Sequence, residues 1–358
     1  MNDLPSSKNS DPNSSHPNRR KRLIGLAKWL IAAAVLVGLL VAGRSAVQQW
    51  AHESQKIQKE IAWVDEAAKS ASGLELAELQ AQRERLDASV PRLENLRWNR
   101  IAFAGLLYGL GLIPPSFLLR RALVSLGEHP RLSTTIAAQL MGHVGKYVPG
   151  KAMVIVIRAG VLSRDGVRPM RATVSIFLET FLMMAVGAVV AGIVVWWLPV
   201  PEWIAITSIV AAIAASLPTF PPILRLVAAK VTKVRVQDVD SQIGWRLFAA
   251  GWFWSTLSWL LIGASFTAIV SAIPSVESVP LTFQLYAIST AAIGLAMVIG
   301  FASLLPGGAG IRELVLTTVL GVAIGTVHGL LAAIAARIVF IVVEAMLAGL
   351  CWCWLRRR

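Results

Sequence analysis

The chain has 358 residues, of which 56% are apolar and only 15% are charged, and its mean hydropathy is +0.64. A water-soluble domain cannot bury so large an apolar fraction, so the composition excludes an ordinary soluble fold. The 34 basic and 20 acidic residues give a net charge of +14, which in a soluble protein would indicate nucleic acid as the partner. Cys351 and Cys353 lie too close together for an ordinary disulfide and are too few for a zinc site.

The N-terminal region divides into a polar and an apolar part. Residues 1–22 are rich in Ser, Asn and Pro and end in a basic run, which predicts a disordered tail. Residues 23–43 are apolar except for Lys28 and are long enough to cross a bilayer, so we predict a first transmembrane helix. A signal peptide is the alternative interpretation, but the run is long for one and GRSAVQQW, which follows it, matches a cleavage site weakly.

Long apolar runs continue through the rest of the chain. They cover residues 101–119, 172–198, 203–217, 245–270, 283–305 and 314–355, the last with an interruption at GTVHG. Together with the first run they predict an all-α polytopic membrane protein with about seven or eight membrane helices. Residues 101–355 then form its main transmembrane domain.

The distribution of charge predicts the orientation. Segments 1–28, 120–171, 219–246 and 356–358 carry net charges of +4, +7, +3 and +3, whereas segments 44–100, 199–203 and 271–283 carry 0, −1 and −1. Lys and Arg collect on the cytoplasmic side of a membrane. We therefore expect both termini, including the basic end 356–358, to be cytoplasmic in a multi-pass protein of a bacterial-type inner (plasma) membrane. Nucleic acid is not needed to explain the charge.

Residues 44–100 have no long apolar run but have a helical pattern. Apolar residues recur at 4-3-4 spacing from Ile57 to Ala68 and again, after a break at residues 70–73, from Leu79 to Leu96. This pattern predicts an extracytoplasmic helical hairpin with a narrow apolar seam. Either the two arms pack against each other or the seam docks a partner protein.

Two hydrophobic segments are interrupted by Pro and Gly. In the first, residues 134–144 and 152–157 flank GKYVPGK, and neither piece can span a hydrocarbon core of about 30 Å. In the second, residues 283–303 and 314–324 flank LLPGGAGIRE. We predict two re-entrant hairpins that enter the membrane from opposite faces.

The two interrupted segments belong to two similar halves of the chain. Each half has a span, a broken hairpin and a span with a buried glutamate, and RATVSIFLETF around Glu179 is similar to ARIVFIVVEAM around Glu344. The charge pattern makes the halves run in opposite directions. This is the pattern of an inverted-topology repeat, whose broken helices mark midplane binding sites in transporters.

Charged and glycine residues near the two breaks form a candidate lipid-headgroup or transport site. Cations near the first break suit a phosphate, and glycines at the second leave backbone N–H groups open to an anion. The ionisable groups inside apolar runs need partners, and we expect Arg337 to pair with Glu179 or Glu313. A purely structural salt-bridge cluster is the alternative. The candidate residues are Lys146, Pro149, Gly150, Lys151, Arg158, Glu179, Pro306, Gly307, Gly308, Gly310, Arg312, Glu313, Arg337 and Glu344.

No catalytic, metal-binding or cofactor-binding pattern is present in the sequence. His129, His143 and His328 lack ligand spacing, and there is no nucleotide-binding loop and no Ser/His/Asp arrangement. We therefore expect no catalytic residue, no metal and no cofactor, and we expect that the protein is not an enzyme.

The chain resembles a known family at the two breaks. GKYVPGKAMVIVIRAG and LLPGGAGIRE are similar to segments in the transmembrane region of lysylphosphatidylglycerol synthases and related flippase-like membrane proteins. The resemblance covers about residues 101–355. Pro306, Gly307, Gly308, Gly310 and Glu313 match the more specific second motif. In the first, Val154 and Ile155 stand where the common form has a Gly-Glu pair, and KYVPGK is similar to a branch associated with glycan or lipid-sugar systems.

The resemblance implies a lipid translocation module of about eight helices. In the full-length enzymes the synthase activity belongs to a separate soluble domain, for which a chain ending at residue 358 has no room. We expect a lipid-binding protein that moves a phospholipid or a polyprenyl-linked lipid across the membrane. The alternative is a non-transporting accessory subunit that holds a glycan- or lipid-modifying enzyme, with the hairpin at 44–100 as a possible protein contact.

Overall fold

The computed structural model describes residues 44, 48, 51–52, 54–90, 92–147, 152–197, 202–223, 225–226, 244–274, 279–302, 308 and 310–357. All regular structure in these residues is helical. The predicted tail at 1–22 and the predicted first transmembrane helix at 23–43 lie outside the described residues.

Five apolar stretches are long enough to cross a membrane. They are Trp98–Ser125, Pro169–Trp196 (α7), Trp245–Ala272 (α11), Phe283–Ala302 (α12) and Thr326–Arg356 (α14). A shorter apolar helix, Glu202–Ser216 (α8), follows α7. The predicted spans at 172–198, 203–217, 245–270 and 283–305 therefore form helices close to their predicted bounds.

The first of these stretches is broken, which the sequence analysis did not predict. Trp98–Gly111 (α3) ends before a short turn, and Pro114–Ser125 (α4) begins with Pro114 and Pro115 in its first turn. Proline has no N–H to donate to the preceding turn, so the helix of α3 cannot continue unchanged through this point.

The first predicted hairpin consists of two short arms. Leu132–Gly142 (α5) and Ala152–Leu162 (α6) have 11 residues each, and a 3-10 helix, His143–Tyr147, follows α5. At 1.5 Å per residue each arm is about 16 Å long, about half of the hydrocarbon core. The second hairpin is unequal, because α12 has 20 residues and Ile311–Ile324 (α13) has 14.

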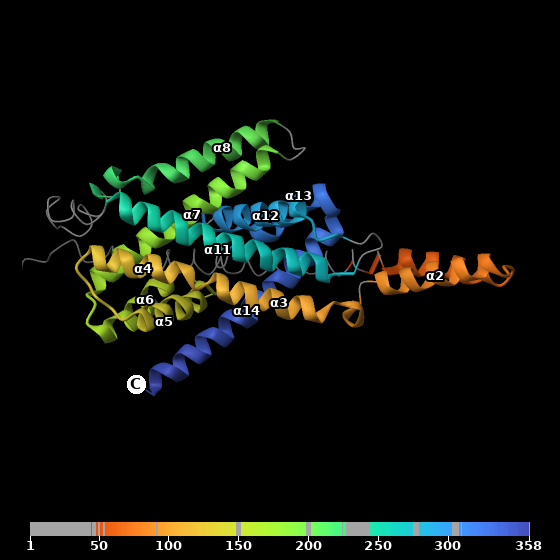
Figure 1. Ribbon diagram of the computed structural model, residues 1–358, viewed down its shortest axis with the longest axis horizontal. Coiled ribbons are helices and arrows are strands. Elements are labelled where there is room, and N and C mark those ends of the chain that lie inside the picture. The colour runs from red at the N-terminus through yellow and green to blue at the C-terminus, as the bar shows by residue number, and fades with distance from the viewer. Residues whose placement is uncertain are drawn as a thin grey trace, which may run out of the picture.

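The packing of the helices follows the two predicted halves. The first half comprises α3, α4, α5, α6 and α7, and the second comprises α11, α12, α13 and α14. Within the halves, α5 packs on α6 and α12 on α13; between them, α7 packs on α12 and α14 on α5. Helix α11 lies along α3 and α4 and runs in the opposite direction (Figure 1). The contact of α7 with α12 is thus the counterpart of the contact of α14 with α5, as expected for two halves related as an inverted repeat.

A helical hairpin projects from one end of the bundle. Residues 54–68 form one arm and Leu74–Ser89 (α2) forms the other. Ile57, Val64, Leu86 and Val90 form a small buried core between the arms. The seam therefore packs the two arms against each other. The C-terminus lies at the opposite end of the bundle (Figure 1).

We expect the hairpin tip and the turn after α6 to face opposite sides of the membrane. Ser72 and Ser163 are exposed in these two turns. In a chain carrying Cys351→Ala and Cys353→Ala, Ser72→Cys should react with an impermeant maleimide on intact cells, and Ser163→Cys should react only after permeabilisation. The reverse pattern would invert the predicted orientation, and labelling of both from one side would contradict the bundle's transmembrane arrangement.

Candidate functional site

Four carboxylates of the described residues are buried; one, Glu128, lies in the turn after α4, and the other three lie on helices of the bundle. The exposed fractions of Glu179, Glu313 and Glu344 are 3%, 7% and 0%. A carboxylate inside a membrane is costly unless it is paired, because lipid offers neither charge nor hydrogen bonds. The partners of Glu179, Glu313 and Glu344 therefore show which faces of the helices meet inside the bundle.

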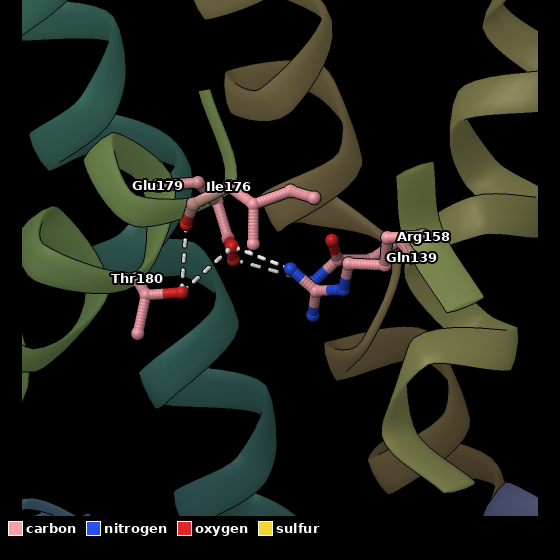
Figure 2. A network of polar contacts seen from close by, with 5 residues as sticks. All are labelled: Gln139, Arg158, Ile176, Glu179 and Thr180. Atoms are coloured by element: carbon pink, nitrogen blue, oxygen red, sulfur yellow. Dashed lines mark hydrogen bonds and ion pairs between the residues drawn. The ribbon is translucent and has the colours of Figure 1, made fainter. Parts of the chain in front are cut away.

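Glu179 is neutralised within the first half. Its Oε2 lies 2.7 Å from Nη1 of Arg158, and its Oε1 accepts a hydrogen bond of 3.3 Å from Gln139 (Figure 2). Thr180 donates a longer hydrogen bond to Oε2. Gly142 of α5 makes room for the arginine, since a Cβ there would lie 2.6 Å from Cγ of Arg158. The Arg158–Glu179 ion pair, together with Gln139, therefore connects α5, α6 and α7.

Glu344 instead links the two halves. This residue of α14 accepts hydrogen bonds from Tyr108 of α3 and from Tyr147, and forms an ion pair with Lys146. The Tyr108 ring stacks on Phe340 with 3.7 Å between ring centroids. Lys146 and Tyr147 belong to the turn after α5, so Glu344 holds the end of the first hairpin against the last helix of the second half.

Glu313 has two roles in the second half. Its Oε2 accepts the N–H of Gly310 at 2.8 Å, which caps α13, and its Oε1 pairs with Arg337. Gly310 has a φ of +80°, which favours glycine at this position. Of the two expected partners of Arg337, Glu313 is confirmed. Pairing with Glu179 is wrong, because Arg158 occupies that carboxylate.

A cavity lies where the two halves meet. Its volume is about 40 Å³, and its polar lining consists of Lys146, Tyr147, Arg312, Glu313 and Arg337. Apolar side chains of α12, α13 and α14 form the remaining wall. This volume holds about two or three water molecules. One small polar space is thus lined by residues that follow α5 and by residues that begin α13, although these are far apart in the sequence.

Arg312 differs from Lys146, Arg158 and Arg337, each of which is paired with a carboxylate. Among the described residues it forms no ion pair, and its buried Nε has no hydrogen-bond partner. Its side chain lies over Gly300, where a Cβ would be 2.8 Å from Cγ of Arg312. The side chain therefore lies between α12 and α13, and no described carboxylate forms an ion pair with it.

The predicted site residues fall into two groups. Lys146, Arg312, Glu313 and Arg337 line the cavity, with Glu344, Gly308 and Gly310 next to them; Arg158 and Glu179 form the separate pair in the first half. Pro149, Gly150, Lys151, Pro306 and Gly307 lie outside the described residues.

Sequence reasoning missed three polar residues of these clusters. Tyr108 and Tyr147 are two of the chain's three tyrosines, and both bind Glu344; Gln139 binds Glu179. The signal in the sequence that could have identified these residues is a side chain capable of hydrogen bonding inside or beside an apolar run. No group of His, Cys, Asp and Glu in the described part of the chain is placed to hold a metal ion.

We expect Arg158 and Glu179 to be strongly coupled. Arg158→Gln or Glu179→Gln leaves the other charge buried and alone, which should lower the free energy of unfolding by about 3–5 kcal/mol. The double variant should lose much less than the sum of the two single variants. Reversible unfolding in detergent measures this, with the exposed Arg121→Gln of α4 as a control. Additive effects of the single variants would contradict the coupling.

Comparison with known proteins agrees with this architecture. A family model described as the lysylphosphatidylglycerol synthase transmembrane region matches residues 86–348. The match contains both charge clusters and the cavity, and it begins within α2. No curated protein matches the chain. The chain is therefore a multi-pass membrane protein that belongs to the lysylphosphatidylglycerol synthase transmembrane-region family.

Proposed function

We propose that the protein binds the anionic headgroup of a membrane lipid between its two halves and moves that lipid across the bilayer. The observation that carries this proposal is the cavity, which joins residues from both hairpins and has more cations than carboxylates on its wall. Membership of a family of flippase-like membrane domains supports a lipid-related function. The lipid is a phospholipid or a polyprenyl-linked lipid, and the protein acts as a carrier without enzymatic activity.

A volume of about 40 Å³ is well below the roughly 300 Å³ of a typical small-molecule site, so a headgroup requires the cavity to widen. The bonds from Lys146 and Tyr147 to Glu344 cross between the halves beside this cavity, so they must break for the halves to separate. An arriving phosphate can replace Glu344 as the partner of Lys146. The new ion pair between Lys146 and the phosphate offsets the free-energy cost of separating the two halves.

We further propose that both termini are cytoplasmic in a bacterial-type inner membrane and that the hairpin at residues 54–90 is extracytoplasmic. A second candidate function is that of an accessory subunit for a glycan- or lipid-modifying enzyme. One observation favours it: most of the hairpin lies outside the family match and projects from the bundle (Figure 1). Loss of enzyme recruitment on deletion of the hairpin, with lipid transport intact, would support this role.

Purified protein in liposomes should accelerate the exchange of fluorescent lipids between leaflets. Lys146→Gln can still donate a hydrogen bond to Glu344 but cannot pair with a phosphate as a cation. A charge-assisted hydrogen bond contributes about 1.5–3 kcal/mol, so the transport rate should fall about ten- to hundredfold. Lys69→Gln, on the exposed hairpin, is the matched control. Protein that transports no tested lipid at any pH would contradict the transport proposal.

A further inference from the structure

A histidine lies beside the contact that links the two halves. His143 is the first residue of the 3-10 helix that follows α5, and Lys146 is three residues further along the same helix. Side chains three residues apart in a 3-10 helix lie above one another. His143 is therefore on the same face of this turn as Lys146, the cation that pairs with Glu344.

Charged groups from four elements act on the His143 imidazole. They are Lys146 of the same turn, Arg158 of α6, Arg312 of α13 and Glu344 of α14. Three of these groups are cations, and the single anion already pairs with Lys146. A proton on the imidazole would add a fourth positive charge around that carboxylate. As long as Lys146 stays on Glu344, the described surroundings therefore disfavour a charged imidazole.

The imidazole of His143 also lacks a hydrogen bond. Its buried Nε2 has no partner among the described residues. His328, another buried histidine, differs in this respect, because its Nε2 lies 2.9 Å from the carbonyl oxygen of Val270. Buried polar atoms without a partner are rare in native proteins and call for an explanation. The unpartnered nitrogen of His143 occurs next to a contact that has to break in the proposed carrier.

We propose that His143 is a proton-binding site that takes up one proton when Lys146 leaves Glu344, so that a lipid anion and a proton cross the membrane together. This inference rests on the proposed function and names its coupling ion. When Lys146 moves to a phosphate, Glu344 keeps its negative charge but loses its cation. A hydronium ion then gives its proton to the free ring nitrogen of His143, leaving water and an imidazolium. The imidazolium replaces the positive charge that Glu344 has lost.

The direction of the pH dependence follows from this exchange. The open state holds one proton more than the closed state, so a fall in pH favours opening. By reciprocity, a bound lipid anion favours protonation of His143. The effect belongs to the range of about pH 5 to 8, in which histidine ordinarily changes its charge. A pH difference across the membrane then drives the lipid toward the side of higher pH.

Histidine-selective ¹⁵N NMR of the full chain in detergent tests the proton site without any added lipid. Loss of a signal in His143→Gln assigns the imidazole, which should be neutral at pH 6 in the parent chain. In Lys146→Gln, which can still bond to Glu344 but carries no charge, His143 should gain a proton between pH 8 and pH 5. A charged His143 in the parent at pH 6, or a neutral one in Lys146→Gln at pH 5, would overturn the proposal.

Two further variants show whether the effect belongs to Lys146. Lys151, which stands between α5 and α6 in the sequence, lies outside the described residues. Lys151→Gln should leave His143 neutral at pH 6, and so should His328→Gln, which changes a buried histidine that has a partner. Protonation of His143 in Lys151→Gln alone would contradict the coupling to Lys146.

The pH dependence of lipid exchange in liposomes tests the coupling itself. With fluorescent phosphatidylglycerol, the parent chain should be about tenfold faster at pH 6 than at pH 8, within the limit of tenfold per pH unit for one proton. His143→Gln should reduce this ratio to less than about twofold, whereas His129→Gln, exposed in the turn after α4, should preserve it. An unchanged ratio in His143→Gln would overturn the coupling.

The two assays distinguish this inference from the proposed function. Protonation of His143 in Lys146→Gln, in a protein that transports no tested lipid, would support the proton site and contradict the carrier. Lipid transport at a rate that depends on pH equally in the parent and in His143→Gln would support the carrier and contradict the role of His143.

Discussion

The arrangement of this bundle depends on the compensation of charges that lipid cannot solvate. Glu344 has no exposed surface, and its three donors come from α3 and from the turn after α5. A rotation of α14 that moved this carboxylate toward the acyl chains would leave it without partners. One face of the last helix is therefore fixed against the first half. That constraint places the end of the first hairpin beside the start of α13, which is what creates the polar cavity.

The two halves have the same architecture but use their charges differently. Glu179 is paired inside its own half, while the equivalent Glu344 is paired across the interface. A fully symmetric pairing would neutralise both hairpin arginines and would leave Lys146 without a carboxylate instead. The cross-half contact instead joins the halves and leaves Arg312 beside the cavity. The two halves therefore differ in their charge pairing although they share an architecture.

The sequence predicts the elements better than their contacts. The lengths of the apolar runs were sufficient to predict α7, α11 and α12. The spacing of Pro and Gly was sufficient to predict the short arms α5 and α6. The break between α3 and α4 was missed, although Pro114 and Pro115 mark it. The pairing of Glu179 with Arg158 and the role of Tyr108 could not be predicted, because periodicity shows which residues share a helix face but not which face of another helix it meets.

In the proposed carrier, the contacts that stabilise the closed cavity would also determine how readily it opens. If Lys146 and Glu344 were paired much more strongly than Lys146 and a phosphate, the closed state would prevail at any lipid concentration. If they were paired much more weakly, the halves would separate without a ligand and expose buried carboxylates to the membrane. A lipid can shift such an equilibrium only by its difference in affinity for the two states. A carrier therefore requires the internal carboxylate and the external phosphate to be competitors of similar strength, and the hydrogen bonds from Tyr108 and Tyr147 adjust that balance on the side of the carboxylate.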